Sequence, residues 1–330
     1  MKLFPIVFTF LLTVSSYAIT PNKDLMLDMS RTYGYYLGQN YALDNIEKKY
    51  PSLKNEIFLV KNEFDLKYLK SIKEIEQFYI KNMSKKQWND FKSTISNGIK
   101  KQLNTNISYE EALESIKTGK ARIKGEIESP VIETLLMFNP AYQKNPILEL
   151  SDNFYQNFNT KNHSKAKGVD FSVKVPKSWK SSEGNRPNII RKFASNNGFI
   201  VDDFFSEYIM FLVFDLPMEV NSLTQQDVNE FCTELPENTI LRECKKTNLE
   251  NLPVITQRFK MNMSRLDANM TIELIQYNIF FKNKIIMIQG HVGTMNQKVS
   301  EKVLLERFEK FKPVFNYVAN SLVINDLYIK

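Results

Sequence analysis

The chain has 330 residues, of which 43% are hydrophobic and 25% are charged, and its net charge is +7. This composition excludes wholesale disorder, and a chain of this length is expected to form one large or two medium domains. The excess of positive charge is modest for the length, so it does not indicate a nucleic-acid-binding protein.

The N-terminus has the pattern of a signal peptide. Lys2 precedes the apolar run Leu3–Val14, and Ser16 and Ala18 place small residues at the two positions that a signal peptidase reads. We therefore expect residues 1–18 to be removed by cleavage after Ala18. A membrane anchor is less favoured, because the run has about 12 residues and a spanning helix needs roughly 20. No later run is long enough to span, so the mature protein is expected to be soluble, without a transmembrane segment, and secreted or periplasmic.

Apolar residues recur at three- and four-residue steps through the first half of the chain, which predicts helices. The expected helices are Leu25–Lys49, Leu53–Ile80, Ser84 to about Leu103, Ser108 to about Lys120, Glu128–Tyr142 and Ile147–Phe158. Two of them open with capping-box spacing, Ser84 with Gln87 and Ser108 with Glu111. Gly34 and Gly38 lie on one helix face, where they are expected to let another helix approach closely.

The polar segment Thr160–Lys167 marks a boundary near residue 165. We expect a helical domain over residues 19–165 and a sheet domain over 166–330, because the period then changes to alternation at Val169–Val175. The expected strands are 169–175, 188–193, 199–201, Tyr208–Leu216, 239–244, 254–263 and the hairpin Asn269–Val292, and the expected helices are 224–232 and Met295–Val323 with a kink at Pro313.

The hairpin Asn269–Val292 is the predicted centre of the sheet. Its polar break contains Asn283, which is expected to take the left-handed turn conformation. Apolar residues change from even to odd positions after Leu274, which predicts a β-bulge or a change of packing partner. The second arm is apolar at both parities over Ile285–Ile288, so both of its faces are expected to be covered.

Helices followed by strands and one closing helix are typical of an α+β fold, here an N-terminal all-helical region followed by an antiparallel β-sheet covered by helices. The segment Phe171–Trp179, in which a strand runs into a Pro-x-x-Trp corner, resembles the PsbP/Mog1-like superfamily, together with the late hairpin and the final helix. The resemblance covers roughly residues 168–325 and implies a non-enzymatic accessory or assembly role, with no catalytic or ligand residue carried over. The N-terminal part is similar to a helical region found before such domains in secreted bacterial proteins.

Cys232 and Cys244 are the two cysteines of the chain. A pair this close in sequence predicts one disulfide in an oxidising compartment, and the alternative is two unpaired buried thiols. The bond would close a loop of about a dozen residues and stabilise the fold by roughly 3 kcal/mol. A metal site is not favoured, because only His163 and His291 are available to join the cysteines.

The sequence contains no nucleophile elbow, Walker loop, dinucleotide fingerprint or zinc-protease helix, so we assign no catalytic, cofactor or metal residue. His163 is expected to be solvated, and His291 is either a site residue or a strand-end histidine satisfied by backbone. Asp202 and Asp203 with Glu207 would hold a cation or act as acid and base, or else form an exposed turn.

The loop Lys180–Pro187 and its surroundings hold Trp179, Glu183 and Arg186, a combination that suits a contact site. The alternative is that Trp179 anchors the corner of the sheet.

These patterns favour an exported, non-enzymatic binding or accessory module with a protein partner, contacted through the face of Gly34 and Gly38. The alternatives are a hydrolase with an unusual carboxylate site, for example Asp203 with Glu207, and a binder of membrane surfaces or acidic polymers that uses the lysines of residues 48–101.

Overall fold

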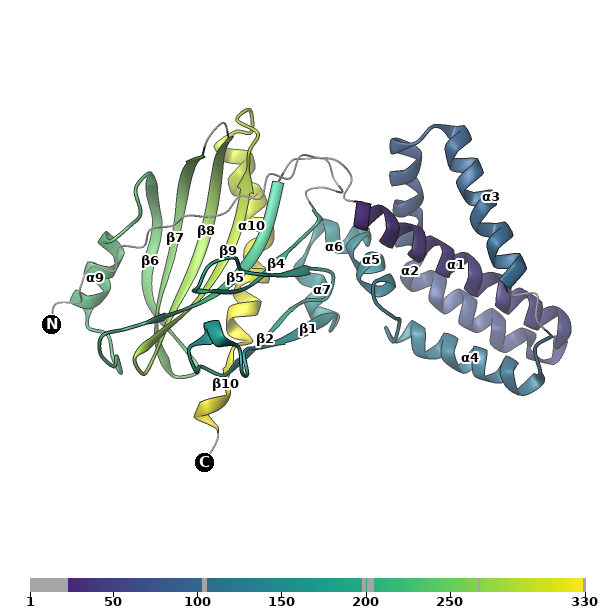
Figure 1. Cartoon of the computed structure of the whole chain (residues 1–330), viewed down its shortest axis with the longest axis horizontal. Coiled ribbons are helices and arrows are strands. Elements are labelled where there is room, and N and C mark those ends of the chain that lie inside the picture. Colours follow the sequence, from purple (N-terminus) through teal and green to yellow (C-terminus); the bar gives the residue numbers. More distant parts are fainter. Residues whose placement is uncertain (1–22, 103–105, 198–199, 201–204, 266–267, 329–330) are drawn as a thin grey trace. The chain divides into compact units, whose positions relative to one another are not determined.

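The structure, a computed structural model, describes residues 23–102, 106–197, 200, 205–265 and 268–328. The chain has the expected α+β fold and divides into two compact units between Lys144 and Asn145. Figure 1 shows helices alone in the first unit, and antiparallel strands with helices in the second.

The first unit contains long helices joined by short connections. Its elements are α1 (Lys23–Lys49), η1 (Pro51–Leu53), α2 (Lys54–Asn82), α3 (Lys85–Gln102), α4 (Tyr109–Ile123), α5 (Val131–Met137) and α6 (Pro140–Lys144). Both predicted capping boxes form: each serine hydroxyl accepts a hydrogen bond from the backbone N–H three residues on, and each glutamine or glutamate side chain accepts one in return. The single helix expected at Glu128–Tyr142 is instead two short helices, α5 and α6.

The face of α1 that carries Gly34 and Gly38 packs inside the unit. A Cβ atom at Gly34 would lie 3.7 Å from Ile95, and one at Gly38 would lie 4.0 Å from Ile99, both on α3. The predicted close helix approach is therefore made by the chain's own α3. The prediction that this face contacts a protein partner is wrong, because α3 already occupies it.

In the described residues, the second unit is built from two antiparallel sheets with three α-helices and two 3-10 turns around them. Its elements are α7 (Ile147–Ser151), β1 (Tyr155–Asn159), η2 (Ser164–Ala166), β2 (Phe171–Pro176), β3 (Lys180–Glu183), β4 (Ile189–Ala194), β5 (Phe205–Asp215), α9 (Gln225–Thr233), β6 (Thr239–Leu249), β7 (Leu252–Arg265), β8 (Ala268–Phe281), β9 (Lys284–Thr294), α10 (Glu301–Asn320), β10 (Val323–Ile324) and η3 (Asn325–Leu327). Among the described strands, the small sheet has the order β1-β2-β10 and the large sheet has the order β3-β4-β5-β9-β8-β7-β6.

Residues 145–165 belong with the sheets and not with the helices, although the boundary was expected near residue 165. The helix expected at Ile147–Phe158 ends at Ser151, and β1 follows it and pairs with β2. Leu150 and Phe158 lie in the same apolar core as β2. Residues 145–165 belong to the sheet unit because their apolar side chains are buried against its strands. The short helical pattern in their sequence does not reveal this burial.

The predicted hairpin forms as β8 and β9, but the left-handed residue of its turn is not the predicted one. The left-handed residue of the turn is Lys282, with a φ of 53°, and not Asn283. Segment 216–220 fixes this turn, because the N–H groups of Leu216 and Val220 donate to the carbonyl groups of Asn283 and Lys282. The pairing of β8 with β7 and β9 runs without a register shift, so the change of parity after Leu274 is not a bulge. It is the predicted alternative, a change of packing partner, because Leu274 and Ile275 belong to different apolar clusters.

The parity change arises because the large sheet buries apolar side chains on both faces. One face, the inner face, packs against α10 and the small sheet, and its core includes Phe211, Ile275 and Ile288 from the strands with Phe311 and Phe315 from α10. Figure 1 shows α10 running along this sheet. We call the opposite face, which does not contact α10, the outer face.

The corner after β2 is fixed by a buried carboxyl group. Glu149 is 4% exposed, and it accepts hydrogen bonds from the N–H and the hydroxyl of Ser178, each 2.7 Å long. Burial raises the pKa of Glu149 to about 7, against hydrogen bonds that lower it. The carboxyl group therefore holds its proton in the folded chain at pH values where the unfolded chain has lost it.

We expect this group to make stability fall as pH rises. The favourable contribution is complete below pH 4.5 and is lost by about pH 7, and the difference between the two pKa values corresponds to about 3 kcal/mol. Glu149→Gln should remove this dependence and exceed the parent in free energy of unfolding at pH 8. Urea denaturation at pH 4.5, 6 and 8 measures the free energy of unfolding of the parent and the variant. Glu183→Gln on the exposed edge of β3 is the control. Equal pH profiles for the parent and Glu149→Gln would contradict the assignment.

Candidate functional site

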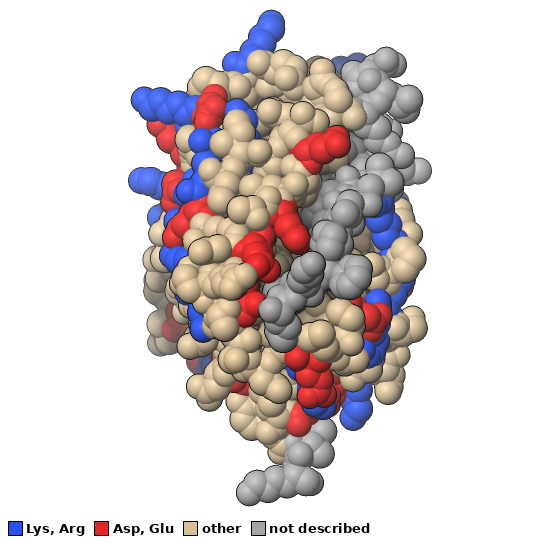
Figure 2. Space-filling model, turned by 90° about the vertical axis from the view of Figure 1, so that its left-hand side faces the viewer, with Lys and Arg blue, Asp and Glu red and all other residues tan. Residues whose placement is uncertain are grey.

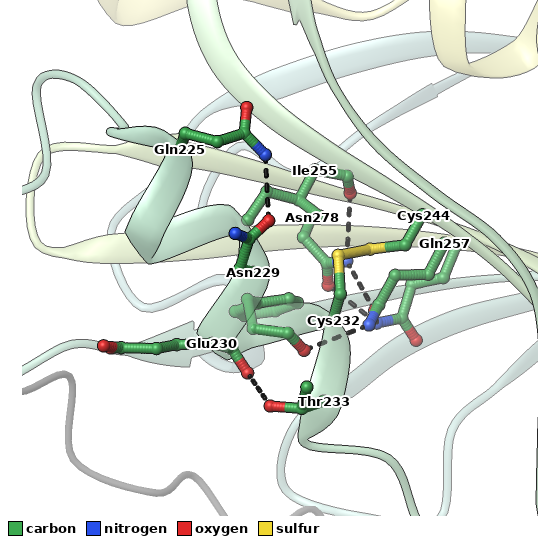
Figure 3. The surroundings of a disulfide bond; sticks show 11 residues. Gln225, Asn229, Glu230, Cys232, Thr233, Cys244, Ile255, Gln257 and Asn278 are labelled. Carbon is green, nitrogen blue, oxygen red and sulfur yellow. Dashed lines mark hydrogen bonds between the residues drawn. A yellow bond between two sulfur atoms is a disulfide. The ribbon is translucent and has the colours of Figure 1, made fainter.

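The disulfide joins α9 to the edge strand β6 (Figure 3). Cys232 and Cys244 are bonded, and their Cα atoms lie 6.0 Å apart, as the sequence predicts. The bond holds α9 over one end of the outer face, where Val228 packs in a cluster with Ile255 and Phe280 of the sheet. Figure 3 shows Gln257 and Asn278 beside the disulfide, so buried polar residues of this face lie next to the bond between Cys232 and Cys244.

The rest of the outer face carries a second apolar cluster, which we call the outer-face cluster. Its buried members lie on four neighbouring strands: Tyr208, Met210, Leu212, Phe259, Met261, Ile272, Leu274 and Met287. Among the described residues, the partly buried side chains packed against it also lie on strands, with the exception of Leu235, which follows α9. No helix that the structure describes contributes a side chain to this cluster.

Strand register aligns a polar row through the middle of this apolar surface. The row runs across six strands, each residue paired with the next: Lys192, Met210, Gln289, Gln276, Gln257 and Cys244. The adjacent row is mostly apolar and runs through Ala194, Tyr208, His291, Leu274, Phe259 and Leu241. Paired residues of neighbouring strands lie side by side on one face, so the two rows form a continuous surface.

The amide groups of the polar row bond to one another in a chain. The side-chain NH2 of Gln289 donates to Gln276 Oε1 over 2.6 Å, and that of Gln276 donates to Gln257 Oε1 over 3.2 Å. Gln257 in turn donates to the carbonyl of Phe231 on α9 over 3.3 Å (Figure 3). These buried amides have partners, as buried polar groups need, so their presence alone does not require a ligand.

The opposite end of the row holds a stack of three charged or aromatic groups. The Nζ atom of Lys192 lies 3.8 Å from the centroid of the Tyr208 ring, and the ring of Tyr208 stacks on that of His291 at 4.3 Å. Burial lowers the pKa of Lys192 to about 8 and raises that of Tyr208. Burial, and then the charge of Lys192, lower the pKa of His291 well below its usual value, so its imidazole is neutral.

One buried polar atom in this stack has no hydrogen-bonding partner among the described residues. Gln289 Oε1 lies 3.2 Å from His291 Nε2 and can only accept, so Nε2 carries the proton and Nδ1 is a bare acceptor. Nδ1 is buried and unpartnered. No described carboxylate pairs with Lys192, whose observed contact is the face of Tyr208. His291 Nδ1 is therefore the one buried side-chain atom of this stack that is left without a hydrogen-bonding partner within the described chain.

The sequence singled out His291 but missed Lys192 and the glutamine row. A signal was present, because Gln276, Asn278 and Gln289 interrupt strands that are otherwise apolar. Their alignment with Lys192 depends on strand order, in which β9 lies between β5 and β8, and that order is not visible in the sequence.

The predicted contact loop is not assembled as a site. Trp179 is 4% exposed, with its ring 6.2 Å from that of Phe311, so it anchors the core and is not a surface contact. Glu183 is exposed on β3, with a carboxylate oxygen 3.6 Å from Lys165 Nζ. Arg186 lies in the turn after β3, where its carbonyl accepts from the N–H of Ile189.

The predicted acidic site is only partly described, since Asp202 and Asp203 lie outside the described residues. Glu207 is fully buried on the inner face, and its Oε1 lies 2.8 Å from Arg307 Nε. It therefore serves as the partner of an arginine. His163 is not fully solvated as expected, because its Nδ1 accepts from the N–H of Lys165. No group of three or more potential metal ligands occurs in the described part of the chain.

Charge is mixed on the helices that the acidic-polymer hypothesis would use, and also on one side of the sheet unit. Lys61 pairs with Asp44, and Lys67 donates to the carbonyl of Ile123 over 2.6 Å. Figure 2 shows acidic side chains across the middle of the side that carries α9, with Lys and Arg mostly toward its margins. Neither observation indicates a basic surface. None of the helices in the described ranges has the length and apolar character needed to cross a membrane.

Comparison of the sequence with protein families and with curated proteins found no match. Among solved structures, LpqN, described as involved in cell envelope biogenesis of Mycobacterium tuberculosis, is 10% identical over 53% of this chain and 93% of its own, with a TM-score of 0.33. A structure from Bacteroides thetaiotaomicron VPI-5482 is 10% identical over 47% of this chain and 44% of its own, with a TM-score of 0.28. Similarity this low supports no argument about function, and the PsbP/Mog1-like resemblance is not confirmed.

Proposed function

We propose that this protein is an exported, non-enzymatic binding module that holds an apolar molecule on the outer face of its large sheet. The observation that carries the proposal is the outer-face cluster. An apolar sheet face of this extent is stable in water when something covers it. Within the described chain, α9 and segment 216–223 cover only the end beside the disulfide.

Export to the periplasm or the medium is supported by the signal-peptide pattern of residues 1–18 and by the disulfide. Disulfides persist in oxidising compartments and are rare in the cytosol. A protein partner, which the sequence favours, stays a prediction, and the face of Gly34 and Gly38 is not its site.

A neutral photoactivatable long-chain alcohol tests the proposed function. Cross-linked peptides should come from β5, β7, β8 and β9, and unlabelled dodecanol should suppress the labelling. Met287→Gln, which introduces an amide beside Asn278 at a fully buried position of the cluster, should reduce labelling several-fold. Met218→Gln is the matched control, because Met218 is 44% exposed and lies outside the cluster. Labelling spread over both units without saturation would contradict the proposal.

A further inference from the structure

We infer that the helical unit pairs with a second copy of this chain through one exposed face of α2, in an antiparallel arrangement around a two-fold axis. The inference goes beyond the proposed function, because it concerns the other unit and names a protein partner. Two observations carry it. One is a stripe of exposed apolar side chains at heptad spacing, and the other is a pair of opposite charges at the edge of that stripe.

The first observation is the stripe on α2, which we call the α2 stripe. Its members recur at steps of three and four residues: Leu59, Asn62, Leu66, Leu69, Lys73 and, seven residues later, Ile80. Leu66 is 84% exposed, the highest value for any large apolar side chain in the described residues, and Leu59 and Ile80 are exposed as well. This spacing is typical of the seam along which one helix packs lengthwise against another.

The other helices of the unit leave the α2 stripe open. The opposite face of α2 holds the buried side chains, including Ile57, Phe64 and Ile75, and α4 packs at the margin of that face, where a Cβ atom at Gly119 would lie 2.7 Å from Val60. Single exposed leucines are normal on a protein surface. A row of apolar side chains along about 30 Å of one helix is not, and it marks an interaction surface.

The second observation selects the partner. Glu63 and Lys70 follow Asn62 and Leu69 along the chain, so both lie on the same edge of the α2 stripe, and both are exposed without an ion pair to a described residue. They are seven residues apart. An antiparallel copy centred near Leu66 therefore brings Lys70 of each copy beside Glu63 of the other, which makes two ion pairs for each dimer.

The seam residues select the same orientation. In a parallel pair, Lys73 would face Lys73 of the second copy within the seam, and such a contact between like charges is unfavourable. In the antiparallel pair, Leu66 meets Leu69 of the second copy at the centre, and Lys73 lies opposite Asn62. The α2 stripe is therefore complementary to itself in one orientation, which is what a two-fold interface requires.

Sedimentation velocity of the chain that begins at Ile19, which keeps every described residue, tests the inference between about 1 and 500 µM. One helix pair is a small interface, so we expect a monomer–dimer equilibrium with a Kd of about 10–100 µM. Leu66→Lys should weaken association at least about tenfold. Val303→Lys is the matched control, because Val303 is an exposed apolar residue on α10 of the sheet unit, and it should leave the Kd unchanged.

Charge reversal tests the antiparallel orientation. Glu63→Lys alone should weaken association about tenfold, because it places two lysines together at both ion pairs. Lys70→Glu alone should have the same effect by placing two glutamates together. The double variant Glu63→Lys with Lys70→Glu should associate as the parent does, because both ion pairs form again with their signs exchanged. Circular dichroism should show equal helix content in all variants, since each replaced side chain is exposed.

The outcomes decide between the occupants of this surface. A chain that stays monomeric at every concentration, or a dimer that Leu66→Lys does not weaken, would overturn the inference. A double variant that associates no better than the single ones would overturn the antiparallel pairing. Monomers that bind vesicles of phosphatidylglycerol would also overturn it, and would assign the α2 stripe to a membrane surface. The proposed function is tested separately, by the labelling of the sheet unit.

Discussion

Gly290→Ala is expected to lower the free energy of unfolding of the sheet unit by about 3 kcal/mol, the upper part of the range for overpacked cores. A Cβ atom at Gly290 would lie 2.3 Å from Cγ of Phe315, closer than any real contact. Phe315 is 1% exposed between other aromatic rings of α10 and the sheet, so its ring has no space to retreat into. Either α10 or the central strand β9 must shift.

Urea denaturation followed by circular dichroism measures this effect. Gly293→Ala on the same strand is the control, because its nearest atom would be 3.2 Å away, on the side chain of Ile272, and a smaller loss is expected. Combining Gly290→Ala with Phe315→Leu should cost less than the sum of the two single changes, since they share one contact. Additive losses would show that α10 does not press on Gly290.

Arg307→Met is expected to cost about 3–5 kcal/mol, because it leaves a buried carboxylate without its cation. Glu207 is fully buried, and Arg307 holds it through Nε at 2.8 Å and a terminal nitrogen at 2.7 Å. Arg307 also donates to the side-chain oxygen of Asn197 over 2.6 Å, so the pair ties β5 and α10 to the segment after β4.

The double variant Glu207→Gln with Arg307→Met should recover much of the loss, because it removes the buried charge as well as its partner. Lys302→Met is the control: its pair with Glu306 is 3.9 Å long and exposed, and such pairs contribute about 0–1 kcal/mol. Thermal and urea unfolding measure the stability of the single variant, the double variant and the control. If Arg307→Met were as stable as the parent, Glu207 would not depend on the arginine, and its role as an acid in the hydrolase hypothesis would regain support.

The sequence predicted those parts of the fold whose signals are local. The capping residues Ser84 and Ser108 fix helix starts through hydrogen bonds within four residues, and both predictions are confirmed. Thr224 likewise caps α9. The pair Cys232 and Cys244 needed only the spacing and the expected compartment. The stretch 152–159 failed because its strand exists through pairing with β2, which its own residues do not indicate.

The candidate site could be predicted only in fragments. His291 was noticed because histidines are scarce in this chain, but it was weighed as an isolated residue. Lys192 lies on a different strand and carries no signal of its own among 44 lysines and arginines. Trp179 was misplaced on a contact surface, because an aromatic residue beside a polar loop has the same local pattern whether it faces solvent or Phe311.

The sequence by itself therefore determined the periods, the caps and the disulfide, because each depends on residues that are close along the chain. Tertiary structure alone decided which strands are neighbours, which parity of β8 faces α10, and that Lys192 lies over the ring of Tyr208, which stacks on His291. The physical reason is that side chains on one face of a sheet interact through strand order and register. In this chain, that order brings residues about a hundred positions apart into one row.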